Sequence, residues 1–175
     1  MEACAGAGAG GRRRLAARLD EIIDDAQGAI DELRALGHGI YPTELREGGL
    51  GHAVRSLATT APISVRVIAD SVGRHAPTVE EAVFFCVREG LQNAAKHAGT
   101  RARVTLSLKR HDEGLEFEIA DDGPGFDPRA QSSGFGLASM RDRIAAVGGE
   151  LEIISAAGQG SRIRGIVSHR GAPTG

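Results

Sequence analysis

The stretch of sequence that decides the fold runs from Arg88 to His97 and reads REGLQNAAKH. Glu89, Asn93 and His97 recur at every fourth position, so a helix gathers them on one face. Lys96 lies beside them, and apolar residues fill the opposite face. The polar face therefore combines an acid, an amide and cationic groups, a mixture that suits a polyphosphate with a bound metal ion.

The residues around this stretch predict the start of a globular domain. A short helical pattern covers 50–57, and alternating apolar residues predict a half-buried strand over 63–68. Thr78 to Glu81 match a capping box, which predicts that the helix carrying the quoted stretch begins there. Gly99 is suited to the C-terminal end of the same helix.

The second half of the chain predicts the rest of a sheet. Two alternating segments joined by a turn at 111–114 predict a hairpin whose second strand ends at Asp121. A loop then runs to Gly136, followed by a helix with one apolar face that stops at Gly148-Gly149 and by a strand pair around 157–160. Together these elements predict an α+β fold, with a mixed sheet and helices on one of its faces.

Length and composition limit the classes of function. With 175 residues, 41% of them hydrophobic, the chain can build one ordinary globular core. Its net charge of -2 and its pI of about 6.3 provide no basic field of the kind that accompanies nucleic-acid binding. Cys4 and Cys86 make no disulfide framework, which fits a reducing cytoplasm. No apolar run approaches the ~20 residues that span a bilayer, so we expect no membrane segment in this chain.

The N-terminal part of the chain differs in character from the rest. Residues 1–11 are rich in glycine and alanine and are expected to form a disordered leader. From 12 to 36 apolar residues recur every three or four positions, which predicts an amphipathic helix with an acidic opposite face. A helix with such an apolar face typically packs against a helix of another chain or against the second helix of a helical hairpin. The globular domain is expected over 37–168, with a disordered tail at 169–175.

Four sequence elements, in order and in their expected structural contexts, resemble the ATPase superfamily shared by DNA gyrase, heat-shock chaperones, mismatch-repair proteins and histidine kinases. They are an asparagine box (Glu89, Asn93, Lys96, His97), a first glycine box (Asp121, Gly123, Gly125), a second glycine box (Gly134, Gly136, Leu137) and a terminal Gly-Thr-like element that ends at Ser161. The short loop between the glycine boxes and the segment 39–45 are similar to the nitrate-sensor branch of histidine kinases. The resemblance covers residues 37–168 and implies the two-layer α/β sandwich of the histidine kinase ATPase, or Bergerat, type.

The resemblance implies that Asp121 reads the adenine base. Its carboxylate can accept a hydrogen bond from the exocyclic amine, a contact that guanine does not offer in the same place. The structural alternative is an ordinary aspartate at a strand end that caps a turn. Gly123 and Gly125 favour the binding role, because they let the backbone pass close beneath a base, whereas a turn needs only one of them.

The other contacts of the implied site involve phosphate and metal. Free N–H groups at the start of the helix opened by Gly134 and Gly136 can cradle phosphate. Asn93 supplies one neutral oxygen to Mg²⁺, which binds ATP largely through phosphate oxygens and water. Glu89 is the candidate catalytic residue; it orients a water or polarises the metal shell, or simply pairs with a neighbouring cation. The implied nucleotide-binding set is completed by Lys96, His97, Leu137 and Ser161.

As a whole, the resemblance implies the ATP-binding catalytic domain of a two-component sensor histidine kinase, which positions Mg-ATP for phosphoryl transfer to a histidine. A phosphoacceptor motif resembling Glu-Leu-His-Asp is missing, since Asp20 stands in the place of the histidine in the nearest string. The acceptor is therefore expected on another segment or chain, and residues 12–36 are interpreted as the remnant of a dimerisation region. Two alternatives stay open. One is an anti-sigma-factor-like serine kinase, against which the long N-terminal helix argues; the other is a non-catalytic ATP-binding or dimerisation module.

The partners implied by the resemblance are ATP, a response regulator and a protein that carries the phosphoacceptor domain. Self-association as a homodimer through 12–36 is also expected. Neither nucleic acid nor a membrane is expected as a partner of this chain. The residues carry no information on the stimulus or on which response regulator is the cognate one.

Overall fold

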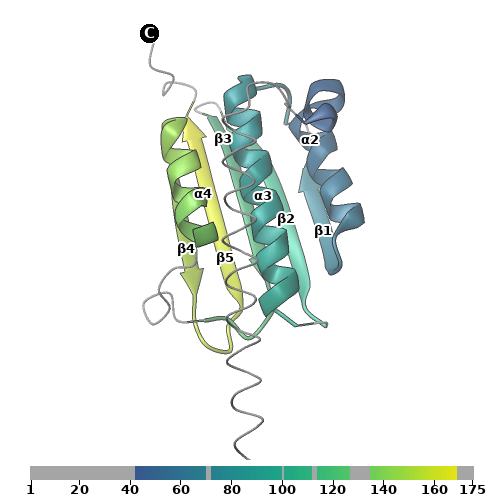
Figure 1. Ribbon diagram of the computed structural model, residues 1–175, viewed down its shortest axis with the longest axis vertical. Helices are drawn as coiled ribbons and strands as arrows, with labels where there is room; N and C mark the ends of the chain where they lie inside the picture. Colours follow the sequence, from purple (N-terminus) through teal and green to yellow (C-terminus); the bar gives the residue numbers. More distant parts are fainter. Residues whose placement is uncertain (1–41, 70–71, 100, 112–113, 127–134, 169–175) are drawn as a thin grey trace, which may run out of the picture. The chain divides into compact units, whose positions relative to one another are not determined.

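Five strands form a single sheet in the order β1-β2-β3-β5-β4 (Figure 1). The computed structural model describes residues 42–69, 72–99, 101–111, 114–126 and 135–168. Along the chain the elements are α2 (Thr43–Thr60), β1 (Ser64–Ala69), α3 (Pro77–His97), β2 (Arg103–His111), β3 (Gly114–Asp121), α4 (Phe135–Ala146), β4 (Gly149–Ser155) and β5 (Ser161–Ser168). The expected leader, the amphipathic helix over 12–36, Gly134 and the tail lie outside the described residues.

The register of the sheet brings the end of β3 next to the start of β5. β1 runs parallel to β2, whereas the other neighbouring strands pair antiparallel, which confirms the mixed sheet and the hairpin expected around 111–114. Asp121, the last residue of β3, faces Ser161, the first residue of β5. Ser161 in turn faces Ser155 at the end of β4. Two predicted site residues, Asp121 and Ser161, are thus neighbours in the sheet.

The helices α2, α3 and α4 lie side by side on one face of the sheet (Figure 1). α3 comes close to the sheet at Gly90, where an added Cβ would lie 2.5 Å from Cδ1 of Ile119. Glycine at this position therefore allows α3 to pack closely on β3. The core between the two layers includes Val87, Leu106, Leu108, Phe117, Met140 and Ile144. The predicted two-layer α+β arrangement is confirmed. None of the described helices is long and apolar enough to cross a membrane.

The other face of the sheet carries charged side chains that form ion pairs. Arg164 on β5 donates to the carboxylate of Glu116 on β3 from both Nε and Nη2, each at 3.0 Å. The hydrogen bond to Glu116, together with its negative charge, raises the pKa of Arg164. Arg162 lies 3.6 Å from Glu118 on the same face. Alternation of these charges with core residues explains the period-two pattern in the sequence.

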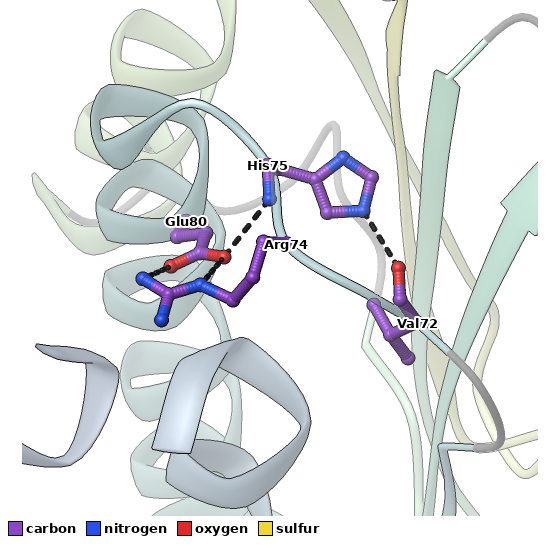
Figure 2. Close-up of polar contacts among 4 residues, drawn as sticks. All are labelled: Val72, Arg74, His75 and Glu80. Atoms are coloured by element: carbon purple, nitrogen blue, oxygen red, sulfur yellow. Dashed lines mark hydrogen bonds and ion pairs between the residues drawn. The ribbon is translucent and has the colours of Figure 1, made fainter. Parts of the chain in front are cut away.

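The prediction of a capping box at the start of α3 is wrong. The helix begins at Pro77, before Thr78, and has no side-chain cap hydrogen bond. Proline suits the first helical position, because the N–H that it lacks would have no partner within the helix. Instead, the fully buried Glu80 reaches back and accepts the backbone N–H of His75 at 3.0 Å (Figure 2). Its carboxylate also accepts hydrogen bonds from Nε and Nη2 of Arg74, at 3.0 and 3.1 Å.

α2 is longer than the predicted pattern over 50–57, and it is kinked. Gly49 has a φ of 69° and a ψ of -178°, which divides the helix into two pieces. The side chain of Arg74 lies over this point, since a Cβ added to Gly49 would be 3.0 Å from its Cδ. Arg74 therefore joins the kink in α2 to the buried Glu80 on α3.

The C-terminal ends of α3 and α4 confirm the predicted stops. α3 ends at His97, and Gly99 follows with a φ of 89°. α4 ends at Ala146, and Gly148 follows with a φ of 73°. Glycine adopts this left-handed conformation without the penalty of a Cβ, which is why it is common just beyond a helix end.

Candidate nucleotide-binding site

The predicted asparagine box lies along one side of α3. Glu89 and Asn93 are half-buried and one helical turn apart, while Lys96 and His97 are exposed in the last turn. The carboxylate of Glu89 lies against the start of α4, where a Cβ added to Gly136 would overlap its Oε1. The first turn of a helix presents unpaired N–H groups that favour a negative charge. The asparagine box and the second glycine box therefore meet at Glu89 and Gly136.

The first glycine box forms a tight loop at the end of β3. The Oδ1 atom of Asp121 accepts the backbone N–H of Gly123 at 2.9 Å. A Cβ added to Gly123 would lie 2.6 Å from the Cα of Ala98, the residue that follows α3. The loop thus passes the C-terminal end of α3 at a distance that only glycine allows.

The turn between β4 and β5 lies on another side of this loop. Gly125 has a φ of 62°, and a Cβ there would overlap a carbonyl oxygen of the turn. Gly160, with a φ of 71°, comes equally close to the carbonyl of Asp121. The N–H of Gly158 donates to the carbonyl of Pro124 at 2.6 Å. The loop is therefore held between the end of α3 and the β4–β5 turn, at the lower end of the sheet in Figure 1.

These contacts join the predicted elements in pairs. Glu89 meets Gly136, and the loop after Asp121 meets the turn that leads to Ser161. Leu137 packs against the hydrophobic core, so it helps to hold α4 on the sheet. Gly134 lies outside the described residues. The roles of all these residues in binding a nucleotide stay predictions.

Sequence reasoning missed two side chains that hold the loop in place. Asp122 accepts the backbone N–H of Arg103 through Oδ1 at 2.6 Å, which ties the loop to the start of β2. The hydroxyl of Ser155 accepts the N–H of Phe126 at 2.8 Å and donates to the carbonyl of Gly160 at 2.9 Å. Both side chains bond to backbone groups that are distant in sequence.

Near Glu89, α3 and α4 are joined by contacts of a buried thiol, an aromatic ring and an arginine side chain. The thiol of the buried Cys86 lies 3.7 Å from a backbone carbonyl oxygen of α4. Burial raises the pKa of this thiol to about 12; the charge of Arg143 opposes the shift, and that of Glu89 adds to it. The guanidinium carbons of Arg88 and Arg143 lie 4.7 and 5.0 Å from the ring centre of Phe85. The cation–π contact of Arg143 joins α4 to α3 beside the site, whereas Arg88 and Phe85 both belong to α3.

The match to a known family agrees with this arrangement of boxes. The family described as "Histidine kinase-, DNA gyrase B-, and HSP90-like ATPase" matches residues 78–169. This range contains the loop, both glycine boxes and the polar face of α3. The chain belongs to this ATPase family.

Within the family, the similar curated proteins are sensor histidine kinases. The chain is 35% identical over 132 residues to the histidine-protein kinase/phosphatase UhpB of Salmonella typhimurium, covering 72% of this chain and 26% of UhpB. It is 34% identical over 146 residues to the sensor histidine kinase NarS of Mycobacterium tuberculosis, covering 79% and 34% of the two chains. It is 30% identical over 151 residues to the sensor protein VraS of Staphylococcus saprophyticus, covering 83% and 42%. The chain thus spans well under half the length of these relatives.

Solved structures show the same fold. The histidine kinase domain of the blue-light-activated kinase EL346 from Erythrobacter litoralis matches with a TM-score of 0.57 and 22% identity, over 69% of this chain and 59% of that one. The catalytic domain of the histidine kinase ThkA matches with a TM-score of 0.57 and 13% identity, over 68% of this chain and 91% of that one. The expected two-layer sandwich of the histidine kinase ATPase type is confirmed.

Proposed function

We propose that this chain is the ATP-binding catalytic domain of a two-component sensor histidine kinase. In this role it positions Mg-ATP for phosphoryl transfer to a histidine on another segment or chain. The observation that carries the proposal is the loop 121–126, which is held against the end of α3 and the β4–β5 turn at positions that accept no side chain. The carboxylate of Asp121 lies at the start of this tightly held loop, where it is proposed to meet the base.

Asp121 is the proposed adenine reader, and its two oxygens have different tasks. Oδ1 accepts the N–H of Gly123 and so fixes the carboxylate. No hydrogen bond to Oδ2 occurs among the described residues, so this atom can accept from the exocyclic amine of adenine. Guanine has a carbonyl oxygen at the equivalent position, and two acceptors repel each other. The turn-capping alternative and the binding role are therefore compatible in one side chain.

The phosphates are proposed to lie between α3 and the start of α4. N–H groups of the first turn of α4, which contains Gly136, donate to phosphate oxygens. Lys96 and His97 add positive charge from the last turn of α3. Ser161 contributes a hydroxyl from the start of β5. Bound ATP supplies the γ-phosphoryl group, and these donors stabilise the negative charge that is spread over it during transfer.

We also propose that Mg²⁺ binds at this site together with ATP. Asn93 offers one amide oxygen, which suffices because phosphate oxygens and water complete the shell of this ion. Glu89, one turn earlier on the same side of α3, is proposed to accept a hydrogen bond from a water in that shell. Its position against Gly136 keeps the carboxylate near the helix start that binds phosphate.

The partners and the location of the whole protein are part of the proposal. By analogy with the sensor kinase relatives, we expect a response regulator and a phosphoacceptor domain as partners, with homodimerisation through 12–36. ATP and a free buried Cys86 both fit a cytoplasmic location.

Calorimetric titration of a non-hydrolysable ATP analogue with Mg²⁺ tests the nucleotide site. We expect saturable binding that GTP does not compete for. Asp121→Asn keeps an oxygen for the N–H of Gly123 but presents an N–H₂ group to the base, so affinity should fall by about ten- to a hundredfold. Asp122→Asn is the matched control, since Asp122 bonds to Arg103 rather than to the base. Absence of binding by the native chain would contradict the proposal.

A second experiment tests the phosphoryl transfer. The chain is mixed with a separately expressed phosphoacceptor helix pair and labelled ATP. Acid-labile phosphate on the helix pair supports the histidine kinase. Acid-stable phosphate on a protein partner would indicate the serine kinase instead, and ATP binding without any transfer would indicate a non-catalytic module.

A further inference from the structure

We infer that Ser155 is a positioning residue of the nucleotide site, and this inference rests on the proposed ATP-binding function. Ser155 is the last residue of β4, outside the four sequence elements of the site. Its side chain nevertheless connects two of them. It links the end of the loop that starts at Asp121 to the turn that leads into Ser161.

The hydroxyl of Ser155 both accepts and donates a hydrogen bond. Its oxygen accepts the N–H of Phe126 at 2.8 Å. Its proton goes to the carbonyl of Gly160, which lies 2.9 Å away. The Oγ atom of Ser161 lies 3.4 Å away. A hydroxyl offers one donor and two acceptor positions, so the side chain of Ser155 can make both backbone contacts at the same time.

The two backbone groups held by Ser155 determine the position of Asp121. Gly160, the acceptor, packs against the carbonyl of Asp121 so closely that a Cβ would not fit. Phe126, the donor, directly follows Gly125, which packs against the β4–β5 turn. Ser155 therefore fixes the separation between the adenine-reading loop and the terminal element. A second link, from the N–H of Gly158 to the carbonyl of Pro124, involves backbone atoms only and does not depend on a side chain.

The position in the strand supports a specific role for the hydroxyl. Leu151 and Ile153 precede Ser155 in the row of β4 that faces the helices, and both pack against the core. An apolar residue continuing this row would leave the N–H of Phe126 without this acceptor. A half-buried N–H that loses its partner costs more than the bond itself contributed. The serine is thus explained by the loop that it holds, not by packing of the core.

The test compares Ser155→Ala with Ser155→Thr, which retains a hydroxyl and suits a strand. Without nucleotide, exchange of the Phe126 amide proton is followed by NMR. We expect it to be about tenfold faster in Ser155→Ala than in the native chain and Ser155→Thr. With the ATP analogue and Mg²⁺, calorimetry should show about five- to tenfold weaker binding for Ser155→Ala, and native-like binding for Ser155→Thr. Ser168→Ala, at the far end of β5 from Ser161, is the control and should change neither quantity.

The possible outcomes separate this inference from the proposed function. Faster exchange together with weaker binding, both restored by threonine, supports the positioning role. Faster exchange with unchanged affinity overturns it, because the loop would then bind nucleotide without the restraint. Unchanged exchange in Ser155→Ala also overturns it, even if the affinity falls. If the native chain does not bind the analogue at all, the proposed function fails first, and the positioning role falls with it.

Discussion

Glu89 on α3 occupies the space that a side chain at Gly136 on α4 would fill, with its Oε1 2.2 Å from the position of the missing Cβ. The two residues are 47 positions apart in the sequence, from 89 to 136. Their contact brings the polar face of α3 to the first turn of α4. It thereby joins the candidate metal and phosphate contacts of the site.

Gly136→Ala should displace Glu89 without unfolding the protein. The overlapping atom is at the tip of a flexible side chain, and alanine is a better helix former than glycine. We expect an unchanged or slightly higher melting temperature, and about three- to tenfold weaker binding of the Mg-ATP analogue. Gly51→Ala in α2 is the matched control, because its Cβ meets only Arg55 Nη1 at 3.5 Å. Equal affinity of Gly136→Ala and the native chain would show that the Glu89 position is not needed for binding.

Arg74 and Glu80 should contribute strongly to stability. Removing the guanidinium takes one positive charge and two hydrogen bonds from a fully buried carboxylate that still accepts a hydrogen bond from His75. Because Arg74 is 57% exposed, we expect Arg74→Met to lower the free energy of unfolding by about 2 kcal/mol, below the usual cost for a fully buried pair. Urea denaturation measures this quantity. The substitution Glu80→Gln should lower the free energy of unfolding by less in the Arg74→Met variant than in the native chain.

The control for this pair is Arg162→Met on the exposed face of the sheet. Arg162 is 54% exposed and lies 3.6 Å from Glu118, so its loss should cost less than about 1 kcal/mol. If Arg74→Met and Arg162→Met had the same effect, the buried carboxylate would have no special role at the start of α3.

The elements that depend on local periodicity could be predicted from the sequence. Alternation along β2 and β3 predicted the hairpin and placed Asp121 at a strand end, and glycines marked the ends of α3 and α4. These features follow from residues a few positions apart, which a sequence displays directly. The order of the four boxes predicted that they form one site; the structure brings described residues of them together in pairs, Glu89 with Gly136 and Asp121 with Ser161.

Contacts between distant segments could not be predicted in the same way. The capping box at Thr78 was misplaced because Glu80 bonds to Arg74 and His75. An arginine in a loop and a glutamate in the first turn of a helix do not reveal that the glutamate will be buried. Ser155 was missed because its partners lie 29 and 5 residues away and are backbone groups, which carry no residue identity. The sequence gives one sign of its role: a polar residue stands on the face of β4 that otherwise carries apolar residues.

Cys86 should react slowly with thiol reagents and should make stability depend on alkaline pH. Burial raises its pKa from 9.0 to about 12, so between these values the unfolded chain loses a proton that the folded chain keeps. Its contribution is therefore complete below pH 9 and is lost as the pH rises towards 12, at up to about 1.4 kcal/mol per pH unit. Urea titrations at pH 8 to about 10.5 should show this decline, which Cys86→Ala should lack. A Cys4→Ser background leaves Cys86 as the one thiol for labelling.

Asn93 should govern the part of ATP binding that depends on Mg²⁺. If its amide oxygen is a metal ligand, Asn93→Ala leaves the contacts to adenine and phosphate in place and removes one ligand from the ion. We expect nearly native affinity for the ATP analogue in EDTA, and loss of most of the increase that Mg²⁺ gives the native chain. Gln92→Ala is the matched control, because it removes a neighbouring amide that points about 100° away around the helix. Calorimetry on the native chain and both variants, with and without Mg²⁺, provides all six affinities. A variant that binds equally weakly in both conditions would place Asn93 on the nucleotide itself, whereas a native response to Mg²⁺ in Asn93→Ala would remove it from the metal shell.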